Sequence, residues 1–292
     1  VTAVNVDAST VVDGVTIRDG NAPGFGNPGN GAGMFIQYGN LTVANVIFTN
    51  NTANQYGGGL YSRYGTPTLQ NVQFLGNEAN YGGGVANYSP VMTLTNAVFR
   101  GNTVLLNGGG LYNNASTPVL TNIIFESNTA STGGGLYNSN SSPVITATRF
   151  ISNAATSSGG ALYQSKAEIW LTDAVLSGNT AKLHGGAIYV SRGVFNGAYL
   201  SMSSNSARYN GGAVFTDRGA LTMTNVFAAY NQGKYGGIFY NDTTTVTLTN
   251  ATFYSNTATI DGGAIFNDGS PATIDHLTAV SNNAEHYGGA LY

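Results

Sequence analysis

Six of the ten basic residues lie at two equivalent positions of a sequence repeat that is about 26 residues long. The first basic row stands just before a Gly-rich segment and consists of Lys182, Arg208 and Lys234. The second basic row stands just after it and consists of Lys166, Arg192 and Arg218. One place before the second row lies an acidic column of Asp217, Asp242 and Asp268. A bound anion would relieve repulsion within either basic row, and a hard cation such as Ca²⁺ would relieve the acidic column.

Aromatic residues run between the two basic rows. They occupy one repeat position, at Tyr163, Tyr189, Phe215 and Tyr240. They alternate with aliphatic residues, so we expect their rings to face outward from a strand. Outward rings beside bases would suit an acidic polysaccharide. The alternative is a set of solvated turn charges, with Asp–Arg pairing between neighbouring repeats.

Composition narrows the function classes. Only 8% of the residues are charged, against about 25% in a typical domain, and the net charge is −3. That balance gives no general attraction to nucleic acid. There is no cysteine, hence no disulfide framework, and no apolar run approaches the ~18 residues that span a bilayer.

The repeat itself is the strongest signal. Glycine pairs begin at Gly57, Gly82, Gly108, Gly133, Gly159, Gly185, Gly211, Gly236, Gly262 and Gly288. An asparagine follows each of the first nine at a constant 20 residues, often three residues after a Phe, as in Phe125 and Asn128. All length variation lies between that asparagine and the next glycine pair, so one turn absorbs insertions while the rest of each unit has fixed length.

A fixed period in this range indicates stacked repeats. Each unit holds three short runs of strand-like alternation: the Gly-Gly segment, a run such as Met92–Thr95, and a run such as Val72–Phe74. We therefore predict an all-β fold, a right-handed, single-stranded parallel β-helix (a solenoid) of about 11 coils of 25–26 residues, with three short strands per coil. The stretch Phe195–Met202 matches poorly, and we expect a distorted coil there.

The marked asparagines are predicted to form an internal ladder, because amides stacked at strand spacing hydrogen-bond to one another. Its members are Asn51, Asn77, Asn102, Asn128, Asn153, Asn179, Asn205, Asn231, Asn256 and Asn282. We interpret it as structural. Residues 1–292 are expected to form a single β-helix domain, with an irregular first coil at 1–30 that includes a loop at 23–30, and regular coils at 31–292. The chain ends inside a repeat, so we expect it to be part of a longer chain.

The Gly-Gly-(Ala/Leu/Ile) and Phe-x-x-Asn motifs resemble the repeats of chlamydial polymorphic outer membrane proteins. They are also similar to right-handed β-helix repeat proteins of other bacteria, whose first coil the segment Val11–Ala22 resembles. The resemblance covers nearly the whole chain. It implies export, a bacterial cell-surface or extracellular location, and an adhesive role toward glycans or proteins of a host or neighbouring cell. It implies no catalytic residues.

Three alternatives remain open. Copies of the chain stacked end to end would form an extracellular filament. A pectate-lyase-like polysaccharide lyase would use Arg218 as base with Ca²⁺ on Asp217, Asp242 and Asp268, although the three histidines share no repeat position. Ice binding would use outward threonine pairs such as Thr93 and Thr95, whose rows Val119, Val144 and Trp170 interrupt. We favour a non-enzymatic adhesive module with no cofactor, Ca²⁺ being the one candidate.

Overall fold

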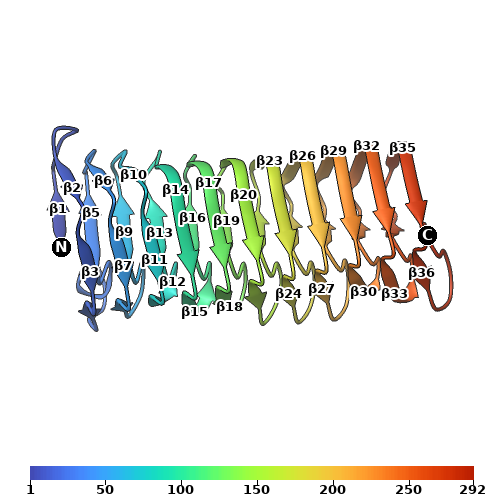
Figure 1. Cartoon of the computed structure of the whole chain (residues 1–292), viewed down its shortest axis with the longest axis horizontal. Helices are drawn as coiled ribbons and strands as arrows, with labels where there is room; N and C mark the ends of the chain where they lie inside the picture. Colours follow the sequence, from blue (N-terminus) through green and yellow to red (C-terminus); the bar gives the residue numbers. More distant parts are fainter.

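The computed structural model describes all 292 residues and is an all-β parallel β-helix built from three sheets (Figure 1). The strands of each sheet pair in parallel with strands one coil away. The predicted fold class, with three strands per coil, is therefore confirmed. No helix in the structure has the length and apolar character that crossing a bilayer requires.

Sheet A contains the segments that follow the glycine pairs. Its eleven strands are β1 (Thr2–Val4), β5 (Met34–Gln37), β9 (Leu60–Arg63), β13 (Val85–Tyr88), β16 (Leu111–Asn114), β19 (Leu136–Ser139), β22 (Leu162–Ser165), β25 (Ile188–Ser191), β28 (Val214–Asp217), β31 (Phe239–Asp242) and β34 (Ile265–Asp268).

Sheet B holds the longest strands. Its main path is β2 (Val11–Asp13), β6 (Thr42–Ala44), β10 (Thr68–Gln70), β14 (Thr93–Arg100), β17 (Val119–Glu126), β20 (Val144–Ile151), β23 (Glu168–Ser177), β26 (Val194–Ser203), β29 (Ala220–Ala229), β32 (Thr245–Tyr254) and β35 (Ala272–Val280). In the first coils the strand is split, which adds β3 (Thr16–Arg18), β7 (Ile47–Thr49) and β11 (Gln73–Leu75).

Sheet C follows the marked asparagines. Its strands are β4 (Asn21–Ala22), β8 (Thr52–Ala53), β12 (Glu78–Tyr81), β15 (Thr103–Asn107), β18 (Thr129–Ala130), β21 (Ala154–Ala155), β24 (Thr180–Ala181), β27 (Ser206–Ala207), β30 (Gln232–Tyr235), β33 (Thr257–Asp261) and β36 (Asn283–Ala284). The loop at 23–30 carries the single 3-10 turn, η1 (Asn27–Gly29).

The division into three sheets differs from the one we expected. The second and third predicted runs form one sheet, because a residue with positive φ, such as Asn96 at 54°, bends each long strand without ending it. Asparagine tolerates this conformation better than most residues. The third sheet instead lies after the marked asparagine, where Ala130 and Ala155 pair side by side.

The core consists of columns of identical or similar side chains. Leu111, Leu136 and Leu162 pair in register and are fully buried. In sheet B, the rings of Phe99 and Phe125 stack with their centroids 4.9 Å apart and are also fully buried. Each column continues from coil to coil, so the apolar interior runs along the rod without a break.

The Phe195–Met202 stretch is not distorted, contrary to our expectation. Strand β26 keeps full register with β23 and β29 on either side. Gly197 occupies an inward position that holds Leu171 in one neighbouring coil and Met223 in the other. The buried Phe195 ring lies against Gly197 and fills the space that a larger side chain would take.

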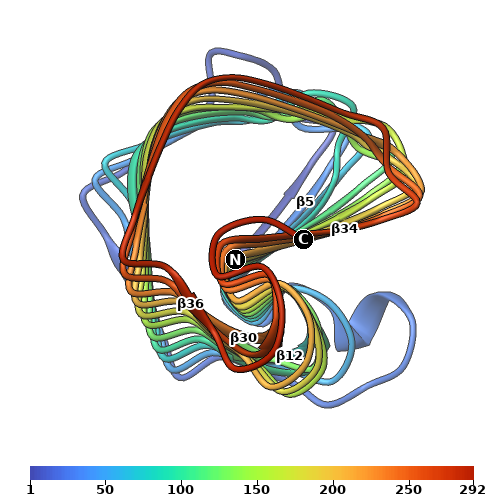
Figure 2. The same ribbon diagram turned by 90° about the vertical axis from the view of Figure 1, so that its right-hand side faces the viewer.

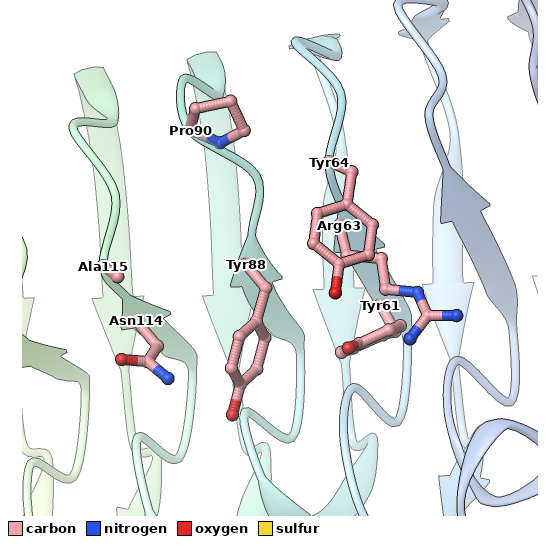
Figure 3. Close-up of a pocket in the computed structure, with 7 residues that line it drawn as sticks. All are labelled: Tyr61, Arg63, Tyr64, Tyr88, Pro90, Asn114 and Ala115. Carbon is pink, nitrogen blue, oxygen red and sulfur yellow. The ribbon is translucent and has the colours of Figure 1, made fainter.

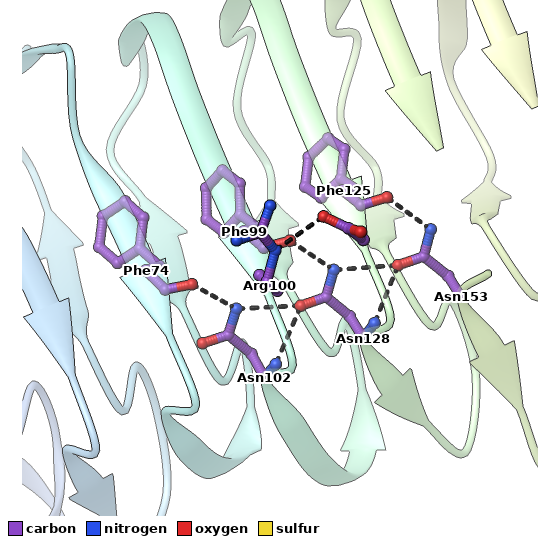
Figure 4. Close-up of polar contacts among 8 residues, drawn as sticks. Phe74, Phe99, Arg100, Asn102, Phe125, Asn128 and Asn153 are labelled. Carbon is purple, nitrogen blue, oxygen red and sulfur yellow. Dashed lines mark hydrogen bonds and ion pairs between the residues drawn. The ribbon is translucent and has the colours of Figure 1, made fainter. Parts of the chain in front are cut away.

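The Asn ladder connects the coils at the corner between sheets B and C (Figure 4). In each step, an asparagine donates its backbone N–H and its side-chain Nδ2 to Oδ1 of the next asparagine. For Asn102 and Asn128 these distances are 3.0 and 2.9 Å. Nδ2 of Asn128 also donates to the carbonyl of Phe99, at 2.9 Å. The ten asparagines thus satisfy backbone groups at a corner where the chain leaves one sheet for another.

Viewed along the rod axis, the coils superpose closely (Figure 2). The strands of sheet A, such as β5 and β34, run into the middle of the outline. The loops that lead from sheet C to sheet A bulge outward beside them. The outer face of sheet A therefore lies next to those loops.

Candidate functional site

The outer face of sheet A carries one ring in nearly every coil, which we call the aromatic ladder. Its members are Phe35, Tyr61, Tyr112, Tyr137, Tyr163, Tyr189, Phe215, Tyr240, Phe266 and Tyr292. From Tyr112 to Tyr292, neighbouring ring centroids lie 4.7–5.4 Å apart in stacked geometry. The ring faces in this part of the ladder are therefore covered by the rings before and after them.

Aromatic side chains from the preceding loops also pack on the aromatic ladder. The ring of His184 lies 4.8 Å from Phe215, and that of Tyr235 lies 5.3 Å from Phe266. As a result Phe215 is only 6% exposed. Elsewhere in the aromatic ladder, burial raises the pKa of the Tyr137 hydroxyl to about 12. Tyr163, Tyr189, Phe215 and Tyr240 lie on the outer face of sheet A, as expected, and stacking with neighbouring rings covers their faces.

The first basic row follows sheet C on the loop side of sheet A. Lys182 and Arg208 come directly after β24 and β27, and Lys234 lies in β30. No acidic group approaches any of the three within 4.0 Å. Two of the cations rest on loop rings instead: Cζ of Arg208 lies 5.6 Å from the centroid of Tyr209, and Nζ of Lys234 lies 5.6 Å from that of Tyr235. Such contacts orient a cation without neutralising it.

A shallow pocket of about 190 Å³ opens between two members of this row. Arg208 and Lys234 line it together with Ser206, Gln232 and Thr259. Hydroxyl and amide groups beside two unpaired cations form a set of hydrogen-bond donors. This arrangement can bind an anionic oxygen group from solvent.

In the second basic row one member, Arg218, forms an ion pair. Lys166, Arg192 and Arg218 each sit at a positive φ in the turn after a sheet A strand, at 58°, 55° and 51°. Asp217 accepts hydrogen bonds of 2.5 and 2.9 Å from Nε and Nη2 of Arg218. These bonds hold the pKa of Asp217 below its usual value. The Asp–Arg pair forms within one turn, rather than between neighbouring coils as expected.

The acidic column is in register but its carboxylates do not converge. Asp217 pairs with Asp242 and Asp242 with Asp268 along sheet A. Asp242 accepts a hydrogen bond from Thr243 at 2.9 Å, and Asp268 accepts one from the Tyr240 hydroxyl at 3.0 Å. The structure contains no group of three or more His, Cys, Asp or Glu side chains that could hold a metal ion. The geometry thus gives the Ca²⁺ hypothesis no support.

The residues considered for lyase chemistry are also poorly placed for it. The hydrogen bond from Arg218 to Asp217 raises the pKa of Arg218, whereas a general base needs a pKa near the working pH. The ring of His184 packs against those of Tyr189, Tyr209 and Phe215. His276 pairs with Asp275 at 2.9 Å on sheet B. These groups do not face a common cleft.

The sequence did not indicate the largest groove, which lies in the N-terminal part of the rod (Figure 3). Its volume is about 530 Å³, and it is lined by Tyr61, Arg63, Tyr64, Tyr88, Pro90, Asn114 and Ala115. These residues come from three successive coils, and none repeats the residue type of its equivalents on both sides. A search for rows of like residues therefore misses them. The one available signal was the missing ring at Ala86, where neighbouring coils have Tyr61 and Tyr112.

Comparisons with known proteins identify the repeat. The Chlamydia polymorphic membrane protein (Chlamydia_PMP) repeat matches residues 45–63, 173–191 and 250–268. Each segment begins at the bend of a sheet B strand and ends with a sheet A strand. Comparisons with curated proteins and with solved structures found no match. The chain is therefore a parallel β-helix, three segments of which are similar to the Chlamydia polymorphic membrane protein repeat.

Proposed function

We propose that this chain is a cell-surface-associated adhesive module that binds acidic glycans through the first basic row. One observation carries the proposal: Lys182, Arg208 and Lys234 stand in three successive coils with no acidic partner within 4.0 Å. The membrane-protein repeat supports the surface association. The ligands would be acidic glycans on a host or neighbouring cell.

The spacing of the row favours a polymer over a small anion. Adjacent coils of a β-helix lie about 5 Å apart, so the row offers one cation at each such step. A chain of uronate residues presents carboxylates repeatedly along one direction and can contact several cations at once. Each contact is weak at a wet surface, but contacts made by one polymer act together. Ser206, Gln232 and Thr259 add neutral hydrogen-bonding groups next to the cations.

Binding to immobilised polygalacturonate tests the proposal, with neutral dextran as the control polymer. Wild-type protein is expected to bind the polyuronate and not the dextran. The double variant Arg208→Ala/Lys234→Ala is expected to bind at least tenfold more weakly. Equal binding of the wild type and the variant would refute the proposal. Release of unsaturated uronate products in the presence of Ca²⁺ would favour the lyase alternative instead.

A further inference from the structure

The aromatic ladder has one gap. In β13 the ladder position holds the buried Ala86 in place of a ring. Tyr88, two residues further along the same strand, occupies this region. Its ring lies 5.7 Å from that of Tyr61, tilted by 52°, and 5.9 Å from that of Tyr112, tilted by 40°. The face-to-face stacking that runs from Tyr112 to Tyr292 therefore does not extend through this coil.

The groove of about 530 Å³ lies beside this gap. Its size falls within the range of small-molecule pockets. Tyr64 borders it with 55% of its surface exposed, while one face of its ring stacks on Tyr38 at 5.0 Å. Figure 3 shows Tyr64 and Tyr88 on neighbouring coils, with Asn114 on the coil beyond them. Tyr88 is packed by the rings of Tyr56, Tyr61 and Tyr112, so the ring surface that this region presents to a ligand is chiefly that of Tyr64.

The groove has a single charged lining residue and no acidic one. The only charged lining residue is Arg63, whose Nη2 donates to Oε1 of Gln37 in the preceding coil at 2.9 Å. Its Cζ lies 5.6 Å from the centroid of Phe35 in the preceding coil and 5.3 Å from the centroid of Tyr64 in the groove lining. In Figure 3 the guanidinium points away from Tyr88 and Asn114. An anionic ligand would therefore find no cation facing it between these two residues.

The polar group that the groove does offer is the Asn114 side chain. Asn87, Asn113 and Asn138 in the same sheet form an internal row of amide hydrogen bonds, and the half-buried Asn114 side chain is not part of that row. An amide both donates and accepts, which suits a hydroxyl group. Aromatic faces beside it suit an apolar ring surface. A pyranose has both features, since its ring C–H groups form an apolar face and its hydroxyls lie around the edge.

We infer that this groove binds a neutral pyranose unit of a glycan, with the sugar ring against Tyr64 and a hydroxyl on Asn114. The site is separate from the first basic row and shares no residue with it. It would take uncharged sugars, which the basic row does not select. The two sites are therefore distinguishable by their ligands and by their variants.

An array of neutral and acidic oligosaccharides is screened first. Calorimetric titration with β-1,4-linked glucose and N-acetylglucosamine trimers then tests this site. Tyr64→Asn and Asn114→Ala are expected to weaken neutral-sugar binding at least tenfold. Asparagine suits the positive φ of 61° at Tyr64, so the fold should tolerate that change. The matched control is Tyr199→Asn, which changes a tyrosine of similar exposure and φ, 63% and 55°, on sheet B.

The expected pattern is loss of binding in the two groove variants and retention in Tyr199→Asn and in Arg208→Ala/Lys234→Ala. The inference is overturned if no neutral sugar binds the wild type. It is also overturned if Tyr64→Asn and Asn114→Ala bind as the wild type does. Binding of a proline-rich peptide, which also favours aromatic grooves, with no sugar binding would assign the groove to a different class of ligand and would likewise overturn it.

Discussion

Oδ1 of Asn128 accepts two hydrogen bonds from Asn102, one from its backbone N–H and one from its side-chain Nδ2. Both residues are fully buried. Replacing Asn128 by alanine removes the acceptor of the Asn102 N–H and the side-chain donor to the Phe99 carbonyl. Each buried unsatisfied group costs about 1–3 kcal/mol. We expect Asn128→Ala to lower the free energy of unfolding by roughly 2–5 kcal/mol, measured by denaturant titration.

Asn122→Gly is the control for this prediction. Asn122 is exposed and sits at a φ of 55°, which glycine adopts freely. Its amide donates to Asn96 only at the surface, so this change should cost less than about 1 kcal/mol. Similar losses for both variants would show that the internal Asn ladder contributes no more than a surface contact.

The two glycines Gly134 and Gly135 should respond differently to alanine. A methyl group at Gly134 would overlap the carbonyl oxygen of Gly160 in the next coil and lie 2.6 Å from that of Ala154. At Gly135 the nearest atom, the Ala161 oxygen, lies at 2.8 Å, and the repeat itself places alanine there in other coils, as at Ala187. We expect Gly134→Ala to destabilise by roughly 2–3 kcal/mol and Gly135→Ala by under about 1 kcal/mol, by thermal unfolding. Equal losses of stability in the two variants would mean that neighbouring coils can move apart locally at Gly134.

The columns of the core could be read from the sequence because stacking turns a constant repeat position into a constant place in space. Leu111, Leu136 and Leu162 needed only the period. The cover over the aromatic ladder was not predicted, since His184 and Tyr235 share a loop position that varies in residue type. The gap at Ala86 was missed for a related reason: its replacement, Tyr88, lies at another repeat position. The period gives the register of a column, while contacts between columns depend on how far the loops fold back over the sheet.

His184 should make stability depend on pH. Burial lowers its pKa, and its Nδ1 is buried without a hydrogen-bond partner. As the pH falls below about 6.5, the usual histidine value, the unfolded chain takes up a proton more readily than the folded chain. Stability should therefore be fully present above that pH and decline as the pH falls toward the lower folded-state pKa.

His184→Tyr removes this titration and keeps an aromatic ring, as at Tyr56, Tyr81 and Tyr235 in the same loop position. Denaturant titrations at several pH values between 7 and 5 should show a smaller decline for this variant than for the wild type. The same slope in both proteins would mean that His184 titrates alike in the folded and unfolded states.

The most direct test of the proposed function compares two variants with the same loss of charge. Arg208→Ala/Lys234→Ala and Lys166→Asn/Arg192→Asn each remove two cations, and none of the four residues forms an ion pair within 4.0 Å. Only the first pair lines the pocket with Ser206 and Gln232. The second pair follows sheet A strands, and the backbone N–H of Arg192 donates to the carbonyl of Asp217. Surface plasmon resonance on immobilised polygalacturonate should show at least tenfold weaker binding for the first variant and near wild-type binding for the second. Equal weakening of both would contradict a specific site at the first basic row and reduce the interaction to general charge.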